Sequence, residues 1–391
     1  MARIHPVMTL LLLLPLLPWR CAGGCGPQEG PRPNNTVVVE HQFDLESTCG
    51  EITLGAHQDV LDRPYLYVAA KDGGFRVYRL DDPPIRISTL PTSQLGNLHA
   101  MNIFQDGNRL YLALGNTFGT AVQDTGMAIL DVTNPEAINI LSVWTDPAHG
   151  GTGMVVARGN LAFLGAMGNG VITFDVSTPA LPVELSRFVP DITFPDARPD
   201  AAKINARGLA VAGNLLYVAY DAGGVRILDV TNPVTPVELG RYSNPALNGH
   251  ARAYNNVVVD GTRAYVAFDY CGVEVLDVSN PSSITALAWW NPWSCEGNSL
   301  RWFSSDGHAN GLALDTVNQL LFVSTGKSDL EVLDVTNPSS PLWAQEYGGV
   351  DNGIGTWGVS IHGSRVFLTY TCAAVPFASN WTGVKILQYH R

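Results

Sequence analysis

Apolar residues recur along the chain in short runs that are bounded by turn residues. The clearest run is an apolar–aromatic–apolar triplet that occurs seven times, at residues 66–68, 110–112, 162–164, 216–218, 264–266, 321–323 and 366–368. Its aromatic residues are 44, 52, 54, 48, 57 and 45 positions apart. A second apolar run follows each triplet, usually after a glycine, and five of these runs end in a phrase such as ILDVTNP at residues 129–135. The pattern predicts a repeat of roughly 50 residues that is built from short strands.

Further aromatic residues extend this repeat. Nine positions after the proline of each phrase stands an aromatic residue: Trp144, Phe188, Tyr242, Trp290 and Tyr347. These residues mark the end of another strand, so that each unit supplies four strands, as a β-propeller blade does. Because a blade is buried on both faces, its strands are apolar at successive positions.

The last unit supplies three strands and lacks a fourth. Residues 38–43 (VVEHQF) resemble residues 183–188 (VELSRF), which end the third unit. We expect this N-terminal segment to complete the last blade, because closure removes the open sheet edges that invite aggregation. The sequence thus predicts an all-β fold, a seven-bladed β-propeller over residues 36–391 that is closed by an N-terminal strand in the last blade.

The repeated phrase LDV[ST]NP resembles the LVIVD repeat of bacterial and archaeal cell-surface proteins. It stands at residues 130–135, 228–233, 276–281 and 333–338, and residues 174–179 (FDVSTP) are a variant. The resemblance covers nearly all of residues 36–391 and implies a β-propeller. It implies no particular reaction.

The first 25 residues are typical of an export signal. Arg3 precedes an apolar run at residues 7–17, which is too short to span about 30 Å of hydrocarbon as a helix. Cys25 follows residues 22–24 (AGG), which are similar to the end of a bacterial lipobox but lack its usual leucine. We predict lipidation at Cys25 and a flexible tether at residues 26–35; secretion without lipid is the alternative. The protein would then be a cell-surface or outer-membrane lipoprotein, or otherwise secreted or periplasmic, and would contact a membrane only through a lipid anchor.

The net charge of the chain excludes some classes of binding partner. Only 15% of the 391 residues are charged, and the formal net charge is −12. Such a chain lacks the basic surface that nucleic acid requires. We therefore expect a protein or a glycan of the cell envelope or exterior as the partner.

Four cysteines lie beyond residue 25, and in an exported chain an even number favours disulfides. In the predicted topology, Cys271 and Cys295 lie on two connections of the fifth blade. Cys372 and Cys49 occupy the corresponding places relative to the seventh blade. This arrangement predicts the pairs Cys271–Cys295 and Cys49–Cys372.

The sequence contains no GxSxG, HExxH, P-loop or CxxC motif. The aspartates of the repeated phrase suit hydrogen bonds to turn N–H groups better than catalysis; they are Asp131, Asp175, Asp229, Asp277 and Asp334. His99, His149, His250 and His308 each precede an innermost strand, so we expect them near one mouth of the central channel. They could bind a metal or hydrogen-bond to neighbouring loops, and we assign no metal, no cofactor and no catalytic residue.

Loop lengths fall into two classes. The long connections, at residues 115–126, 189–205, 291–310 and 369–383, join the second strand to the third or one blade to the next. In a propeller these two kinds of connection lie on one face, and insertions on one face of a repeat scaffold usually form its binding surface. We call it the long-loop face.

Tryptophans are concentrated in one sector of the long-loop face. The predicted ligand-binding residues are Trp289, Trp293, Trp302, Arg301, Asp306, His308, His250 and His149. The alternative is that the tryptophans fill the space beneath a long loop.

We therefore predict an exported, surface-displayed propeller that acts as a binding or scaffolding module through its long-loop face. One alternative is a hydrolase or lyase that uses the histidine-rich mouth of the channel. Another is a purely structural protein of the cell envelope.

Overall fold

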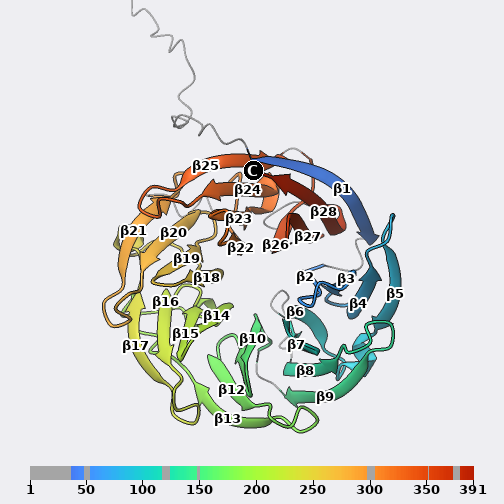
Figure 1. The fold of residues 1–391 in the computed structure, drawn as a ribbon. Helices are drawn as coiled ribbons and strands as arrows, with labels where there is room; N and C mark the ends of the chain where they lie inside the picture. Colours follow the sequence, from blue (N-terminus) through green and yellow to red (C-terminus); the bar gives the residue numbers. More distant parts are fainter. Residues whose placement is uncertain are drawn as a thin grey trace, which may run out of the picture. The chain divides into compact units, whose positions relative to one another are not determined.

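The computed structural model describes residues 37–47, 53–116, 124–147, 150–296, 304–350, 352–372 and 379–391. Within these residues the strands form seven four-stranded antiparallel sheets. Figure 1 shows the sheets arranged as blades around a common centre. The seven-bladed β-propeller predicted from the sequence is therefore confirmed. In the described part of the chain, no helix is long and apolar enough to cross a membrane.

Each of the first six blades consists of four consecutive strands, from the innermost to the outermost. Blade one contains β2 (Gly55–Gln58), β3 (Tyr65–Ala69), β4 (Phe75–Arg79) and β5 (Ile85–Leu90). Blade two contains β6 (His99–Asp106), β7 (Arg109–Gly115), β8 (Thr125–Asp131) and β9 (Asn139–Asp146). Blade three contains β10 (Val155–Arg158), β11 (Leu161–Gly165), β12 (Val171–Asp175) and β13 (Val183–Phe188). Blade four contains β14 (Gly208–Ala212), β15 (Leu215–Ala219), β16 (Val225–Asp229) and β17 (Val237–Tyr242). Blade five contains β18 (Asn256–Asp260), β19 (Arg263–Ala267), β20 (Val273–Asp277) and β21 (Thr285–Trp290). Blade six contains β22 (Gly311–Asp315), β23 (Leu320–Ser324), β24 (Leu330–Asp334) and β25 (Leu342–Tyr347). Blade seven contains β26 (Thr356–His362), β27 (Arg365–Tyr370), β28 (Thr382–His390) and, as its outer strand, β1 (Val38–Ser47).

The two middle strands of a blade are buried on both faces. In blade four, β15 and β16 are each buried at four of five positions. The outer strand β17 is only half-buried and exposes Val237 and Arg241. Burial on two faces explains why the aromatic triplet has apolar neighbours on both sides.

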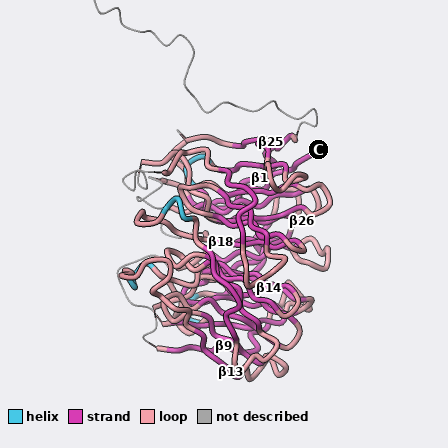
Figure 2. Tube along the Cα trace, turned by 90° about the vertical axis from the view of Figure 1, so that its left-hand side faces the viewer, coloured by secondary structure: helices cyan, strands magenta, loops and turns pink. Residues whose placement is uncertain are grey.

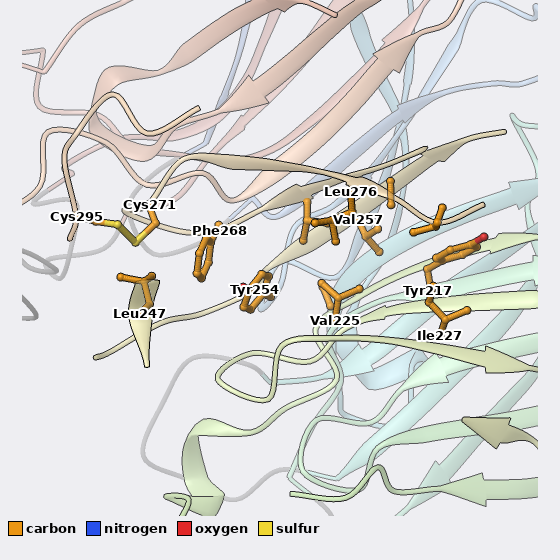
Figure 3. Close-up of a cluster of buried hydrophobic side chains, with 14 of the residues drawn as sticks. Tyr217, Val225, Ile227, Leu247, Tyr254, Val257, Phe268, Cys271, Leu276 and Cys295 are labelled. Atoms are coloured by element: carbon orange, nitrogen blue, oxygen red, sulfur yellow. A yellow bond between two sulfur atoms is a disulfide. The ribbon is translucent and has the colours of Figure 1, made fainter. Parts of the chain in front are cut away.

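The hydrophobic core is divided among the junctions between neighbouring blades. Figure 3 shows the cluster between blades four and five, where Tyr217 and Ile227 pack with Val257 and Leu276. A comparable cluster lies at each of the other six junctions of the described ring. Each sheet is thus held in place by both of its neighbours.

The N-terminal strand closes the ring as predicted. β1 pairs antiparallel with β28, from Val38 opposite His390 to Ser47 opposite Thr382. Leu45 of β1 is buried in the cluster between blades seven and one, together with Leu66 and Phe367. The closure therefore combines backbone pairing with core packing.

The aspartates of the repeated phrase have the structural role that we predicted. Each accepts a hydrogen bond of 2.8 to 2.9 Å from the N–H group two residues on. The five bonds join Asp131 to Thr133, Asp175 to Ser177, Asp229 to Thr231, Asp277 to Ser279 and Asp334 to Thr336. These carboxylates fix the turn between the third and fourth strands.

The predicted disulfide between Cys271 and Cys295 is present. It joins the turn after β19 to the connection that leaves β21. Cys372 is also disulfide-bonded. Its predicted partner, Cys49, lies outside the described residues, so the second pair stays a prediction.

Candidate functional site

Among the described residues, the connections between blades and those between the second and third strands lie together on one face of the propeller. Figure 2 shows short 3-10 helices among the loops at the left of the view, away from the strands. They are η1 (Thr92–Gln94), η2 (Ala201–Lys203), η3 (Pro245–Leu247) and η5 (Gly326–Ser328). Each of them lies either between two blades or between the second and third strands of one blade.

On this face, neighbouring blades are joined by isolated β-bridges. The turn after the second strand of one blade pairs with the residue that precedes the inner strand of the next, as Asp221 does with Tyr254 and Asp269 with Ala309. The φ angles of Asp221 and Asp269 are +50° and +45°, a region that aspartate tolerates better than most residues. The described bridges fix the beginning of the inner strands of blades two, four, five and six.

A chain of polar side chains crosses blades four, five and six at this level. Arg207 donates to Asp221 Oδ2 at 3.0 Å and to Asn255 Oδ1 at 2.9 Å. Asn255 donates in turn to Asp269 Oδ2 at 3.1 Å, and His308 Nδ1 lies 2.5 Å from Asp269 Oδ1. The predicted His308 therefore belongs to a hydrogen-bonded network and is only 1% exposed.

Burial changes the acidity of Asp221, one member of this network. Desolvation raises the pKa of Asp221, although the positive charge of Arg207 and a hydrogen bond from Asn205 oppose the shift. The loss of solvation of the Asp221 carboxylate is therefore only partly compensated by its hydrogen-bond and ion-pair partners.

The centre of the ring holds a cavity of about 560 Å³ that is lined by the inner strands. Its wall is mostly apolar and includes Leu54, Val155 and Val257. His57 also lines it, and burial lowers the pKa of this imidazole to about 4, so that it is neutral at pH 7.

A cleft of about 720 Å³ lies on the long-loop face, where the chain enters blades four and five. We call it the loop cleft. Its walls come from residues 194–207, from Asp221 and Ala222, and from residues 249–252. A cavity of this size is typical of small-molecule sites.

Arg252 ties the walls of the loop cleft together. Its guanidinium donates to the carbonyl oxygens of Ala222 at 3.0 Å and Leu247 at 2.8 Å, and it pairs with Asp196. Arg252 is 4% exposed, so its guanidinium is buried, whereas the carboxylate of Asp196 is partly open to solvent. One arginine thus links three segments that are distant in the sequence.

Arg226 and Arg241 hold the outer part of the same loop. Arg226 donates to the carbonyl oxygens of Asp191 at 2.9 Å and Phe194 at 3.1 Å, and its guanidinium lies 4.9 Å from the centre of the Phe194 ring. Arg241 pairs with Asp191 at 2.9 Å. The long insertion is therefore anchored to blade four.

The predicted ligand-binding residues are divided among several places. His250 lines the loop cleft, whereas Trp293 and Asp306 line a separate cavity of about 270 Å³. Trp289 donates its indole N–H to the carbonyl oxygen of Cys271 at 2.8 Å and packs against the core between blades four and five. Trp302, Arg301 and His149 lie outside the described residues.

The basic residues of the loop cleft were not among those predicted from the sequence; they are Arg198, Lys203, Arg207 and Arg252. A signal was present, because the first three lie within ten residues at the end of one long insertion. Their convergence with Arg252 requires the fold.

The comparisons with known proteins agree with this architecture. The profile of the LVIVD repeat matches residues 149–189, 205–244, 249–288 and 317–348, which fall in blades three to six. No curated protein matches the chain.

Three solved structures are similar in fold. A computationally designed protein, Ika8, is 12% identical, with a TM-score of 0.54 over 86% of this chain and 83% of that chain. A chain of the mitotic checkpoint complex is 11% identical, with a TM-score of 0.58 over 98% and 99%. The WD40 repeats of RRP9 are 12% identical, with a TM-score of 0.60 over 91% and 98%. At such identities the likeness concerns the fold alone. The chain is a seven-bladed β-propeller that contains LVIVD repeats in four stretches.

Proposed function

We propose that the protein is an exported binding module that holds its ligand on the long-loop face, in the loop cleft. The observation that carries this proposal is the construction of the cleft. An insertion outside the repeat forms one wall, and two buried arginines fix that wall: Arg226 of blade four and Arg252, which precedes blade five. A rigid scaffold that positions irregular loops is a common arrangement for binding.

Ligand screening by thermal shift tests the proposal. Compounds, peptides and oligosaccharides that bind the native state raise the melting temperature by mass action. Ala202 lines the cleft and is exposed, so Ala202→Trp should fill the cleft and abolish the shift. The matched control is Ala180→Trp at an exposed turn between the third and fourth strands of blade three, which should keep the shift.

Two outcomes would contradict the proposed site. In one, no member of the screen stabilises the wild type. In the other, ligands stabilise Ala202→Trp as well as they stabilise Ala180→Trp.

Export and a lipid anchor at Cys25 are part of the same proposal. The disulfide Cys271–Cys295 supports an oxidising compartment. Cys25→Ser should move the protein from the membrane fraction to the soluble fraction, whereas Cys21→Ser should leave it with the membrane. Unchanged fractionation of Cys25→Ser would remove the anchor from the proposal and leave the loop cleft unaffected.

A hydrolase or lyase at the mouth of the channel is the second candidate. The contact between His308 and Asp269, at 2.5 Å, is the observation in its favour, because such pairs orient a catalytic imidazole. The burial of His308 counts against it, since a substrate would need access to a side chain that is 1% exposed.

A further inference from the structure

The charges of the loop cleft differ from those of the whole protein. Four cationic side chains and three carboxylates line it, whereas the formal net charge of the chain is −12. Cations are therefore concentrated in a cleft of a protein that is otherwise acidic.

Two of these cations are paired with carboxylates of the protein. Arg207 pairs with Asp221 at 3.0 Å, and Arg252 pairs with Asp196 and with two carbonyl oxygens. Both arginines serve mainly to hold the walls.

The other two cations remain available to a ligand. Lys203 lies 3.4 Å from Asp200, and the side chains are 73% and 57% exposed, so that water and salt weaken this pair. Arg198 makes no ion pair with any carboxylate of the described residues. His250 adds a ring nitrogen to the same cleft.

The rest of the lining is largely apolar. Phe194, Pro195, Pro199 and Ile204 come from the long insertion, and Ala251 faces them from the segment before blade five. Apolar walls with a few convergent polar groups are typical of sites for small organic ligands.

We propose that the loop cleft binds a small organic anion, with its acidic group at Arg198 and Lys203 and its apolar part against Phe194, Pro195 and Ile204. The inference rests on the proposed function of this cleft and adds the chemical class of the ligand. A guanidinium and an ammonium group stabilise a carboxylate or sulfonate, and apolar contact supplies the remaining affinity.

Two fluorescent probes distinguish the contribution of charge to binding from that of apolar contact. The anionic probe is 8-anilino-1-naphthalenesulfonate, and the neutral probe is N-phenyl-1-naphthylamine, which has the same rings without the sulfonate. We expect the wild type to bind the anionic probe more tightly, and we expect this affinity to fall as salt rises from 50 to 500 mM, because the cations of the cleft are partly exposed.

The variant Arg198→Ala/Lys203→Ala should lower the affinity for the anionic probe at least tenfold and leave the affinity for the neutral probe unchanged. The matched control is Arg86→Ala/Arg365→Ala, which removes two exposed cations of other blades and should leave both affinities unchanged. Ala202→Trp should reduce binding of both probes, because it fills the cleft.

Three results would overturn the inference: equal affinity for both probes, no loss in the Arg198→Ala/Lys203→Ala variant, or no binding of either probe. If Ala202→Trp blocks both probes while the double variant behaves as wild type, the cleft binds ligands without selecting anions. That result would contradict the inference but not the proposed function. If Ala202→Trp blocks neither probe, both the inference and the proposed binding site are wrong.

Discussion

A glycine precedes the third strand of four blades because no side chain fits there. The φ angles of Gly74, Gly170, Gly224 and Gly272 lie between 72° and 83°. A Cβ atom at any of them would lie 2.0 to 2.2 Å from a carbonyl oxygen at the end of the outer strand. The recurring glycine of the sequence thus permits close contact between the turn and the last strand.

The close contact predicts a large effect of Gly224→Ala. The Cβ atom would lie 2.2 Å from the carbonyl oxygen of Tyr242, so the turn or β17 must move. Gly213 is the matched control, because its φ angle is also positive, at 55°, but no atom lies within 4 Å of an added Cβ. Gly213→Ala should lower the free energy of unfolding by about 1 kcal/mol, and Gly224→Ala by at least twice as much. Equal losses in urea unfolding would show that the contact with Tyr242 is unimportant.

In blade six this glycine is replaced by Asp329. The residue keeps a positive φ of 62°, and its carboxylate fits because Gly348 leaves room: a Cβ at Gly348 would lie 1.7 Å from Asp329 Oδ2. Asn352 donates to the same oxygen at 2.7 Å. Burial raises the pKa of Asp329 to about 7, and the charge of Lys385 only partly opposes the shift.

This shift predicts a pH-dependent gain from Asp329→Asn. The folded protein holds the proton up to about pH 7, whereas the unfolded chain releases it near pH 4. The carboxyl group therefore lowers the free energy of unfolding as the pH rises from 4 to 7, by up to about 4 kcal/mol. The variant should gain stability over wild type across this interval in thermal unfolding at several pH values.

Asp72→Asn is the control, because Asp72 is exposed. Parallel stability curves for wild type and Asp329→Asn would show that Asp329 does not titrate in this range.

At the scale of elements, the third strand carries a buried ionisable residue at its second position in four blades. The residues are Arg76, Arg226, Glu274 and Glu331. Glu274 accepts hydrogen bonds from Tyr254, Asn244 and Tyr242 at 3.0, 2.7 and 3.2 Å, and burial raises its pKa to about 7. A polar contact therefore lies within the otherwise apolar junction between blades four and five.

The disulfide Cys271–Cys295 should stabilise the junction of blades four and five. It closes a loop with a sequence separation of 24, and both cysteines are buried in the core that Figure 3 shows. Cys271→Ser/Cys295→Ser should lower the free energy of unfolding by about 3 kcal/mol, mainly because the unfolded chain gains freedom. Calorimetry with and without reductant checks this. A reductant should destabilise the wild type more than the variant; equal responses would contradict the assignment.

The repeat was predictable at this scale, whereas the loop cleft was not. Strand order and closure follow from local signals, such as the aromatic triplet, the LDV phrase and the match of residues 38–43 to residues 183–188. The cleft depends on contacts that Arg252 makes with residues far from it in the sequence. Leu247, Ala222 and Asp196 lie 5, 30 and 56 residues before it. An insertion outside the repeat has no period from which such contacts could be deduced.

At the scale of the molecule, the core forms a closed series of junctions, and β1 completes the last. Deleting residues 37–47 should expose the edge of β28 and remove Val37 and Leu45 from two clusters. We expect a loss of roughly 5 kcal/mol in the free energy of unfolding. Deletion of residues 26–36, which has the same length, should leave the melting temperature unchanged. Equal melting temperatures of the two truncations would contradict the role of β1 in closure.

The pairing of β1 with β28 also orders the events of biosynthesis. The ribosome makes Val38 early and His390 late, yet these residues lie opposite each other in one sheet. Blades one to six can form as soon as their own consecutive residues are available, whereas blade seven must wait until β28 has been made. If the chain is exported, its last blade assembles only after β28 has been translocated. A nascent or truncated product would then have an open ring with an unpaired strand edge, which chaperones and proteases could distinguish from the mature protein.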